Sequence, residues 1–207
     1  MLPDPEKFKD VDFIIHAGDI GPDYHPARPK KEIIRWYENE LFHWALDIGK
    51  PIYMTYGNHD FIGERIPERV KESLAPNMKI YIDEQVDIEG KKVWFSPWSN
   101  LFGDWAFMRT EQGLEALYAA IPNDTQVIIS HGPPYGYGDY VPDQGINVGS
   151  ASLILAARNL PQMELIVCGH IHEGRGIYKD GKVDIINASL VDEHYNMIHE
   201  PVIIDWD

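Results

Sequence analysis

The 207-residue sequence has one cysteine, little positive charge and no long apolar run. Cys168 cannot form a disulfide within the chain, and such sparing use of cysteine is typical of the reducing cytosol, so we expect a cytoplasmic protein. The 18 Lys and Arg against 33 Asp and Glu give a formal net charge of -15, which argues against wrapping nucleic acid or lying on an anionic membrane. The apolar run at 165–168 is far too short to span a bilayer.

Hydrophobic residues make up 44% of the sequence and aromatic residues 12%, which excludes a disordered chain. Because we find no repeat, low-complexity tract or linker, we expect one domain over residues 1–207. The acidic composition does not exclude a phosphorylated substrate, since bound metal ions supply positive charge locally.

Short apolar runs alternate with helical periodicity early in the chain. Residues 11–16 and 51–56 predict strands, and the apolar stripe between them predicts a helix over 30–48, so these segments form a β-α-β unit with parallel strands. Further strands are predicted over 79–82, 85–96 with a turn at 89–90, 126–130 and 164–168. Helices are predicted over 64–74, 110–120 and 151–159, the last capped by Ser150. Residues 132–149 predict a long loop, and 176–179, 182–188 and 201–206 a β-meander.

Four of the predicted strands end in residue types that ligate metal ions. In chain order these are Asp19, then Asn58, His59 and Asp60, then His131, then His170 and His172. Because ligands gather outside the carboxyl ends of parallel strands, we expect these side chains to converge. Oxygen and imidazole donors together suit Mn, Fe, Zn or Ni, and the glycine beside each group permits a sharp turn.

The order of these motifs resembles that of the calcineurin-like metallophosphoesterases: GD at 18–19, GNHD at 57–60, HG at 131–132 and GHIH at 169–172. The stretches HGPPYGYGD at 131–139, SPW at 96–98 with DWAF at 104–107, and IHEG at 171–174 are similar to the metallophosphoesterase-domain-containing branch. That branch is related to the class III cyclic-nucleotide phosphodiesterases. The resemblance implies an α/β fold, a two-sheet β-sandwich flanked by helices, with the site at the strand carboxyl ends.

Carried over position by position, the resemblance also implies the roles of the site residues. Two divalent ions are expected, with Asp19 bridging them, one ion held further by Asn58, His131 and His170, and the other bound by His172. His59 resembles the general acid that protonates the leaving alkoxide, with Asp60 tuning it. The implied reaction is phosphoester hydrolysis, phosphodiesters before monoesters, by in-line attack of a metal-bound hydroxide.

Two residues are candidates for contact with a small phosphoester or nucleotide substrate. Arg175 follows the GHIH motif and is a candidate phosphate clamp, and Tyr135 is a candidate for stacking on a nucleobase. A surface arginine and an aromatic residue that packs its own loop are the alternatives, and the sequence leaves both pairs of interpretations open.

The chain departs from the family pattern before Gly18, where an Asp-x-His motif is expected and none is found. Asp23-Tyr24-His25 has the right residues but follows the second motif. Either Met1 is an internal methionine of a longer chain, or the protein folds without its first strand. In the second case it uses one ion, or borrows Asp23, His25 or a partner chain, and the exposed strand edge favours a homodimer. The alternative function is a one-metal or metal-poor relative that binds a nucleotide or phosphate with little or no turnover.

Overall fold

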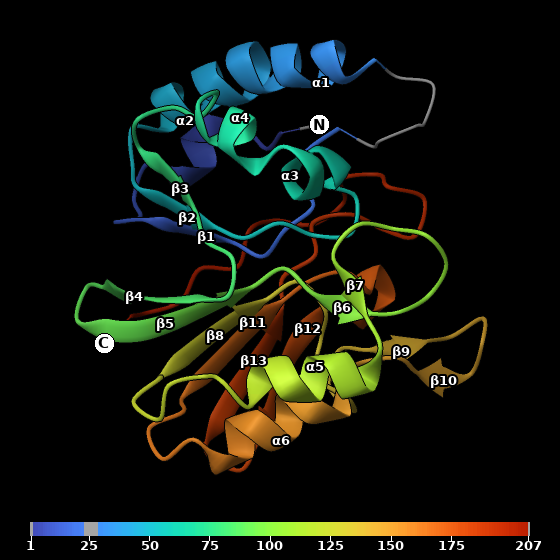
Figure 1. Cartoon of the computed structure of the whole chain (residues 1–207). Coiled ribbons are helices and arrows are strands. Elements are labelled where there is room, and N and C mark those ends of the chain that lie inside the picture. Colours follow the sequence, from blue (N-terminus) through green and yellow to red (C-terminus); the bar gives the residue numbers. More distant parts are fainter. Residues whose placement is uncertain (1, 23–28, 207) are drawn as a thin grey trace.

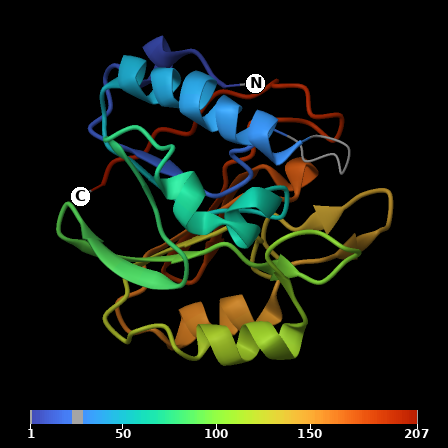
Figure 2. The same cartoon turned by 45° about the horizontal axis from the view of Figure 1, so that its top comes forward.

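Two β-sheets lie face to face between two layers of helices in the computed structural model, which describes residues 2–22 and 29–206 (Figures 1 and 2). The smaller sheet has the order β1-β2-β3, with all strands parallel, formed by Ile14–His16, Ile52–Met54 and Met78–Ile80. The larger sheet has the order β12-β13-β11-β8-β5-β4, formed by Gly176–Asp180, Val183–Asn187, Leu165–Cys168, Val127–Ser130, Lys91–Ser96 and Glu84–Ile88. Its four central strands are parallel, and the edge strands β12 and β4 are antiparallel to their neighbours. The predicted two-sheet architecture flanked by helices is confirmed.

One long helix covers the outer face of the smaller sheet. It consists of α1 (Lys30–Trp36), the π-helical turn η2 (Tyr37–Leu41) and α2 (Phe42–Ile48), in agreement with the predicted helix over 30–48. Its predicted stripe is buried, at Ile33, Tyr37, Leu41, Trp44 and Ile48. The helix ends at Gly49, which adopts a left-handed φ of 66° and donates its N–H to Ala45 O at 3.1 Å.

Shorter helices complete the two outer layers. The smaller sheet is also covered by α3 (Phe61–Arg65) and α4 (Pro67–Lys71), where the sequence predicts one helix over 64–74. Pro67 begins α4, because a proline fits the first turn of a helix but not its interior. The larger sheet is covered by α5 (Glu111–Tyr118) and α6 (Ala151–Asn159), and 3₁₀ turns lie at Pro5–Phe8 (η1) and His172–Gly174 (η3). In residues 2–22 and 29–206, no helix has the length and apolar character that crossing a membrane requires.

The core of the described chain consists of one apolar cluster at each interface between layers. Strand alternation assigns side chains to these clusters. In β5, Val93 and Phe95 face the space between the sheets, whereas Trp94 faces the layer of α5 and α6. In β8, Ile129 and Ile128 divide in the same way. These strands are therefore apolar on both faces, which explains their continuous hydrophobic runs.

Two predicted segments differ from the structure. The strand predicted over 201–206 is wrong: these described residues form no strand, and the segment is held through its side chain, since Trp206 packs on Phe13 at 5.0 Å and donates its indole N–H to Ile88 O. The loop predicted over 132–149 contains a short hairpin, β9 (Tyr140–Val141) and β10 (Ile146–Asn147). A small parallel pair, β6 (Ser99–Asn100) and β7 (Met108–Arg109), lies in the stretch after β5. The candidate substitutes Asp23 and His25 lie outside the described residues.

Candidate metal and catalytic site

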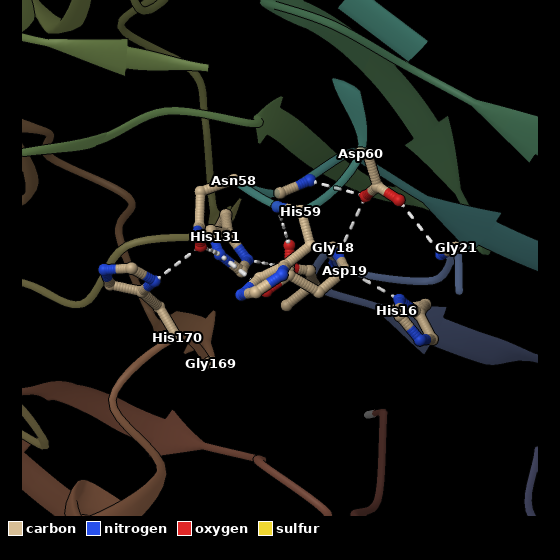
Figure 3. A network of polar contacts seen from close by, with 12 residues as sticks. His16, Gly18, Asp19, Gly21, Asn58, His59, Asp60, His131, Gly169 and His170 are labelled. Carbon is tan, nitrogen blue, oxygen red and sulfur yellow. Dashed lines mark hydrogen bonds and ion pairs between the residues drawn. The ribbon is translucent and has the colours of Figure 1, made fainter. Parts of the chain in front are cut away.

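The smaller sheet contributes two turns that are tied together by the buried carboxylate of Asp60. One oxygen of Asp60 accepts the N–H groups of Asp19 at 2.9 Å and Gly57 at 2.8 Å, and the other accepts the N–H of Gly21 at 2.9 Å (Figure 3). Asp19 itself adopts a left-handed φ of 59°, a conformation that is uncommon for residues other than glycine. The turn after β1 is therefore fixed against the turn after β2 by a side chain placed in the GNHD motif.

The pKa values of Asp60 and Asp19 are shifted in opposite directions. Burial and the negative charge of Asp19 raise the pKa of Asp60 to about 6, against the lowering effect of the N–H groups of Gly21 and Gly57. Burial also acts to raise the pKa of Asp19, but the charges of His131 and His59 and the His59 N–H outweigh it and leave that pKa below its usual value. The lowered pKa keeps Asp19 ionised, the form in which a carboxylate ligates a metal ion.

Four candidate metal-ligating side chains, from turns after strands of both sheets, meet in one cluster around Asn58 (Figure 3). Asn58 Oδ1 lies 2.8 Å from His131 Nε2 and 2.8 Å from His170 Nδ1. His131 Nε2 also lies 3.3 Å from Asp19 Oδ2. Asp19 and Asn58 follow β1 and β2, whereas His131 and His170 follow β8 and β11. The structure therefore brings together four of the five predicted metal ligands.

In its neutral form, the His131 ring contributes a lone pair to this cluster. His131 Nδ1 lies 2.9 Å from the carbonyl oxygen of Ala17, and a carbonyl only accepts, so Nδ1 donates its proton there. In the neutral ring Nε2 then carries a lone pair, and it faces the oxygens of Asn58 and Asp19. Metal-ligating histidines usually have this arrangement: one ring N–H donates to a backbone carbonyl, and the other ring nitrogen faces the metal site.

The spacing of these donors fits a single divalent ion. Ligands at about 2.0–2.2 Å from one ion lie about 2.8–3.6 Å from each other, and the donor pairs here are 2.8 to 3.3 Å apart. His170 contacts the cluster through the side-chain oxygen of Asn58. Across residues 2–22 and 29–206, no group of three or more His, Cys, Asp or Glu side chains is arranged to hold a metal ion by itself, so an ion at this place needs the amide oxygen of Asn58 as well. The donor set that fits is therefore two imidazoles, one carboxylate and one amide oxygen.

His170 is neutral in this environment. Burial, followed by the charge of His131, lowers the pKa of His170 to about 3, and the neutral imidazole is the form that ligates metals. The residue also adopts a left-handed φ of 67°. Non-glycine residues in this conformation cost energy and cluster at functional sites, and Asp19 and His170 are both of this kind.

His59 lies beside the cluster and is half-buried. Its backbone N–H donates to Asp19 Oδ1 at 2.8 Å. The imidazole lies between two aromatic rings, with centroid distances of 4.6 Å to Trp105 and 5.6 Å to Tyr195, and Nε2 is 3.2 Å from the Tyr195 hydroxyl. No pattern in the sequence points to Tyr195, and Trp105 is marked there only as part of the DWAF stretch.

The remaining predicted site residues have other partners in the structure. His172 Nδ1 lies 2.9 Å from Asp192 O, which leaves Nε2 as its acceptor nitrogen. Arg175 donates to Ser189 O at 2.6 Å and Glu200 O at 2.7 Å, so its guanidinium anchors the segment after β13. Tyr135 is 52% exposed at the loop after His131. Metal ligation by His172 and by the four residues of the cluster, the catalytic roles of His59 and Asp60, and substrate contact by Arg175 and Tyr135 all stay predictions.

Comparison with known proteins agrees with the fold and shows the family of the chain. A profile of the family described as calcineurin-like phosphoesterase matches residues 2–174. Metallophosphoesterase domain-containing protein 1 of Homo sapiens is 30% identical over 219 residues, covering 98% of this chain and 67% of that protein. A UPF0046 protein of Caenorhabditis elegans is 28% identical over 217 residues, covering 95% of this chain and 73% of that protein. The crystal structure of the protein TT1561 of Thermus thermophilus shares the fold at a TM-score of 0.61 and 14% identity, covering 89% of this chain and 80% of that one.

The fold and the match to the family profile over residues 2–174 define a metallophosphoesterase. The chain belongs to the calcineurin-like phosphoesterase family, and within it to the branch of the metallophosphoesterase-domain-containing and UPF0046 proteins. Members of this family generally bind divalent metal ions, and the assignment makes this chain a phosphoester hydrolase.

Proposed function

We propose that the chain is a metal-dependent phosphodiesterase in which Asp19, Asn58, His131 and His170 hold a divalent ion and His59 is the general acid. The observation that carries the proposal is the convergence of donor atoms from both sheets on Asn58 Oδ1, with two imidazole nitrogens at 2.8 Å. When bound there, a divalent ion supplies Lewis acidity and positive charge to the phosphoryl group.

The chain's own residues then position the reacting groups. Asp60 holds the turns that carry Asp19 and Asn58 in register, so the donors are preorganised. His59 is adjacent to Asn58 in the chain and is tied to Asp19 through its N–H, so its ring lies at the edge of the cluster. Its proton passes to the leaving oxygen as water adds to phosphorus and the ester bond breaks, a transfer that typically contributes about 10²–10⁴ in rate.

Two aromatic side chains, Phe102 beside His170 and Trp105 beside His59, support a diester rather than a monoester substrate. Phe102 lies 5.3 Å from the His170 ring and Trp105 4.6 Å from the His59 ring, both between ring centroids. A phosphodiester carries an organic group on each side and only one negative charge, which suits aromatic walls. A monoester carries a second charge that these walls do not solvate. A small aryl or nucleotide diester is the substrate class we infer.

The test compares bis(p-nitrophenyl) phosphate with p-nitrophenyl phosphate as substrates after EDTA treatment and Mn(II) reloading. We expect a higher kcat/KM for the diester. With diphenyl phosphate, whose basic phenolate leaving group requires protonation, we expect a kcat lower by about 10²-fold or more in His59→Ala with unchanged Mn content. His43→Ala, which changes an exposed histidine of α2, is the matched control. Faster monoester cleavage would overturn the diester preference, and full activity of His59→Ala would overturn its role. Nucleotide binding without product formation would identify the chain as a binding relative instead.

A further inference from the structure

Residues 188–200, which follow β13, form a loop that is held at both ends by other parts of the chain and contacts the candidate site. Arg175 donates to the carbonyl groups of Ser189 and Glu200 near its two ends, and Lys7 forms an ion pair with Glu200 at 2.6 Å. Between these anchors, Val191 and Met197 form an isolated antiparallel bridge. The loop is therefore fixed at its base from two other parts of the chain.

The tip of the loop is held by Asp192. Its carboxylate accepts the N–H groups of His194 at 2.9 Å and Asn196 at 2.8 Å, together with the Asn196 side-chain amide at 3.0 Å. Its carbonyl accepts the Tyr195 N–H at 3.0 Å and also lies 2.9 Å from His172 Nδ1. One residue thus ties the tip of the loop to a predicted metal ligand.

Tyr195 stands at this tip in a conformation that its burial does not explain. Its φ is 61°, in the left-handed region, and the side chain is 56% exposed. Such a φ is unfavourable for a non-glycine residue, and it persists only where the surroundings impose it. An exposed side chain returns little of that cost through apolar burial.

Tyr195 contacts two histidines of the site. Its ring lies 5.6 Å from the His59 ring and 5.1 Å from the His172 ring, both edge-on, and its hydroxyl lies 3.2 Å from His59 Nε2. A phenol both donates and accepts, so it holds Nε2 whichever ring nitrogen carries the proton. The loop therefore presents a group that restricts rotation of the His59 imidazole.

We propose that Tyr195 is a positioning residue for the reaction, holding the His59 imidazole at the angle from which it protonates the leaving group. This inference rests on the proposed phosphodiesterase function. A misplacement of about 1 Å in a reacting group can cost about 10²-fold in rate. Loss of the hydroxyl is thus expected to slow the proton transfer and to leave substrate binding in place.

The experiment uses two diesters that differ in their need for an acid. Diphenyl phosphate releases a basic phenolate that requires protonation, whereas bis(p-nitrophenyl) phosphate releases a stable anion that does not. With the Mn(II)-loaded enzyme, we expect Tyr195→Phe to lower kcat for diphenyl phosphate by about 10-fold or more and for the nitrophenyl ester by less than about threefold. KM and Mn content are expected to stay unchanged. Tyr53→Phe, which removes a hydroxyl on β2, is the matched control.

Each other result has a defined meaning. An equal loss on both esters, no loss on either, or a rise in kcat would overturn the positioning role while the proposed function stands. A wild-type enzyme that cleaves neither diester would overturn the proposed function and this role with it. A drop in Mn content in Tyr195→Phe would show that the residue supports His172 rather than His59, which also overturns the inference.

Discussion

At the scale of single residues, the site depends on how closely two ligand side chains approach the backbone of the turn after β2. Gly57 is the critical position, because a Cβ there would lie 2.3 Å from Asp19 Oδ1 and 2.5 Å from His131 Cε1. We predict that Gly57→Ala displaces both ligands, abolishes Mn(II) retention and lowers the free energy of unfolding by about 1–3 kcal/mol through overpacking. Denaturant unfolding and elemental analysis of the same preparation measure the two effects.

Gly90 provides the control for this substitution. It lies in the β4–β5 turn with a φ of 86°, and a Cβ added there would have nothing within 4 Å, so Gly90→Ala changes backbone strain without crowding. We expect a loss of about 1 kcal/mol there and full metal retention. If Gly57→Ala retained its ion as Gly90→Ala does, close backbone approach would not be what shapes the site.

At the scale of elements, α5 and α6 are joined at their N-termini by Glu111. Its carboxylate accepts the Ser152 N–H at 2.6 Å, the Ser150 hydroxyl at 3.1 Å and the Asn100 amide at 2.9 Å. Burial acts to raise the pKa of Glu111, but these hydrogen bonds outweigh it and lower that pKa. The carboxylate thus satisfies an N–H of the first turn of α6 that the Ser150 cap does not reach.

We predict that Glu111→Gln lowers the free energy of unfolding by about 1 kcal/mol near neutral pH, the usual size of a capping effect at a partly exposed site. Because the pKa is lowered on folding, the contribution is present above the unfolded pKa and is lost as pH falls through the folded one. The deficit is therefore expected to shrink toward pH 3, in urea titrations at several pH values. Glu115→Gln, on the same helix but exposed, should show neither change. A deficit independent of pH would mean that the charge of Glu111 does not matter.

The helices and strands also show which parts of the fold can be predicted from the sequence. The apolar runs of β5, β8 and β11, the stripe of the long helix and the Ser150 cap are local patterns, and the structure confirms them. The 201–206 segment has the composition of a strand, but its position depends on Trp206 finding Phe13, a contact between opposite ends of the chain. Tyr195 escaped prediction for the same reason, since its importance lies in a φ and two ring contacts that only the folded loop creates.

At the scale of the whole molecule, the donor cluster joins the two sheets. Asp19 and Asn58 follow strands of the smaller sheet, and His131 and His170 follow strands of the larger one. An ion held by all four would therefore bridge the two layers on either side of the inter-sheet cluster of Val93, Phe95 and their neighbours. Since such an ion binds the folded state and not the separated layers, it should stabilise the whole fold and not one turn.

We predict that Mn(II) raises the Tm of the EDTA-treated protein, with a gain of about 2.7 kcal/mol at a free concentration 100 times the dissociation constant. Asn58→Leu removes the amide oxygen that lies 2.8 Å from both imidazoles, and should abolish most of this gain. His43→Ala, remote on α2, should keep it.

Elemental analysis after desalting then counts the ions bound per chain. One per chain would match the cluster described here, and two would require that His172 and further ligands complete a second site. An equal Tm gain in Asn58→Leu and wild type would place the ion elsewhere and separate it from the junction of the sheets.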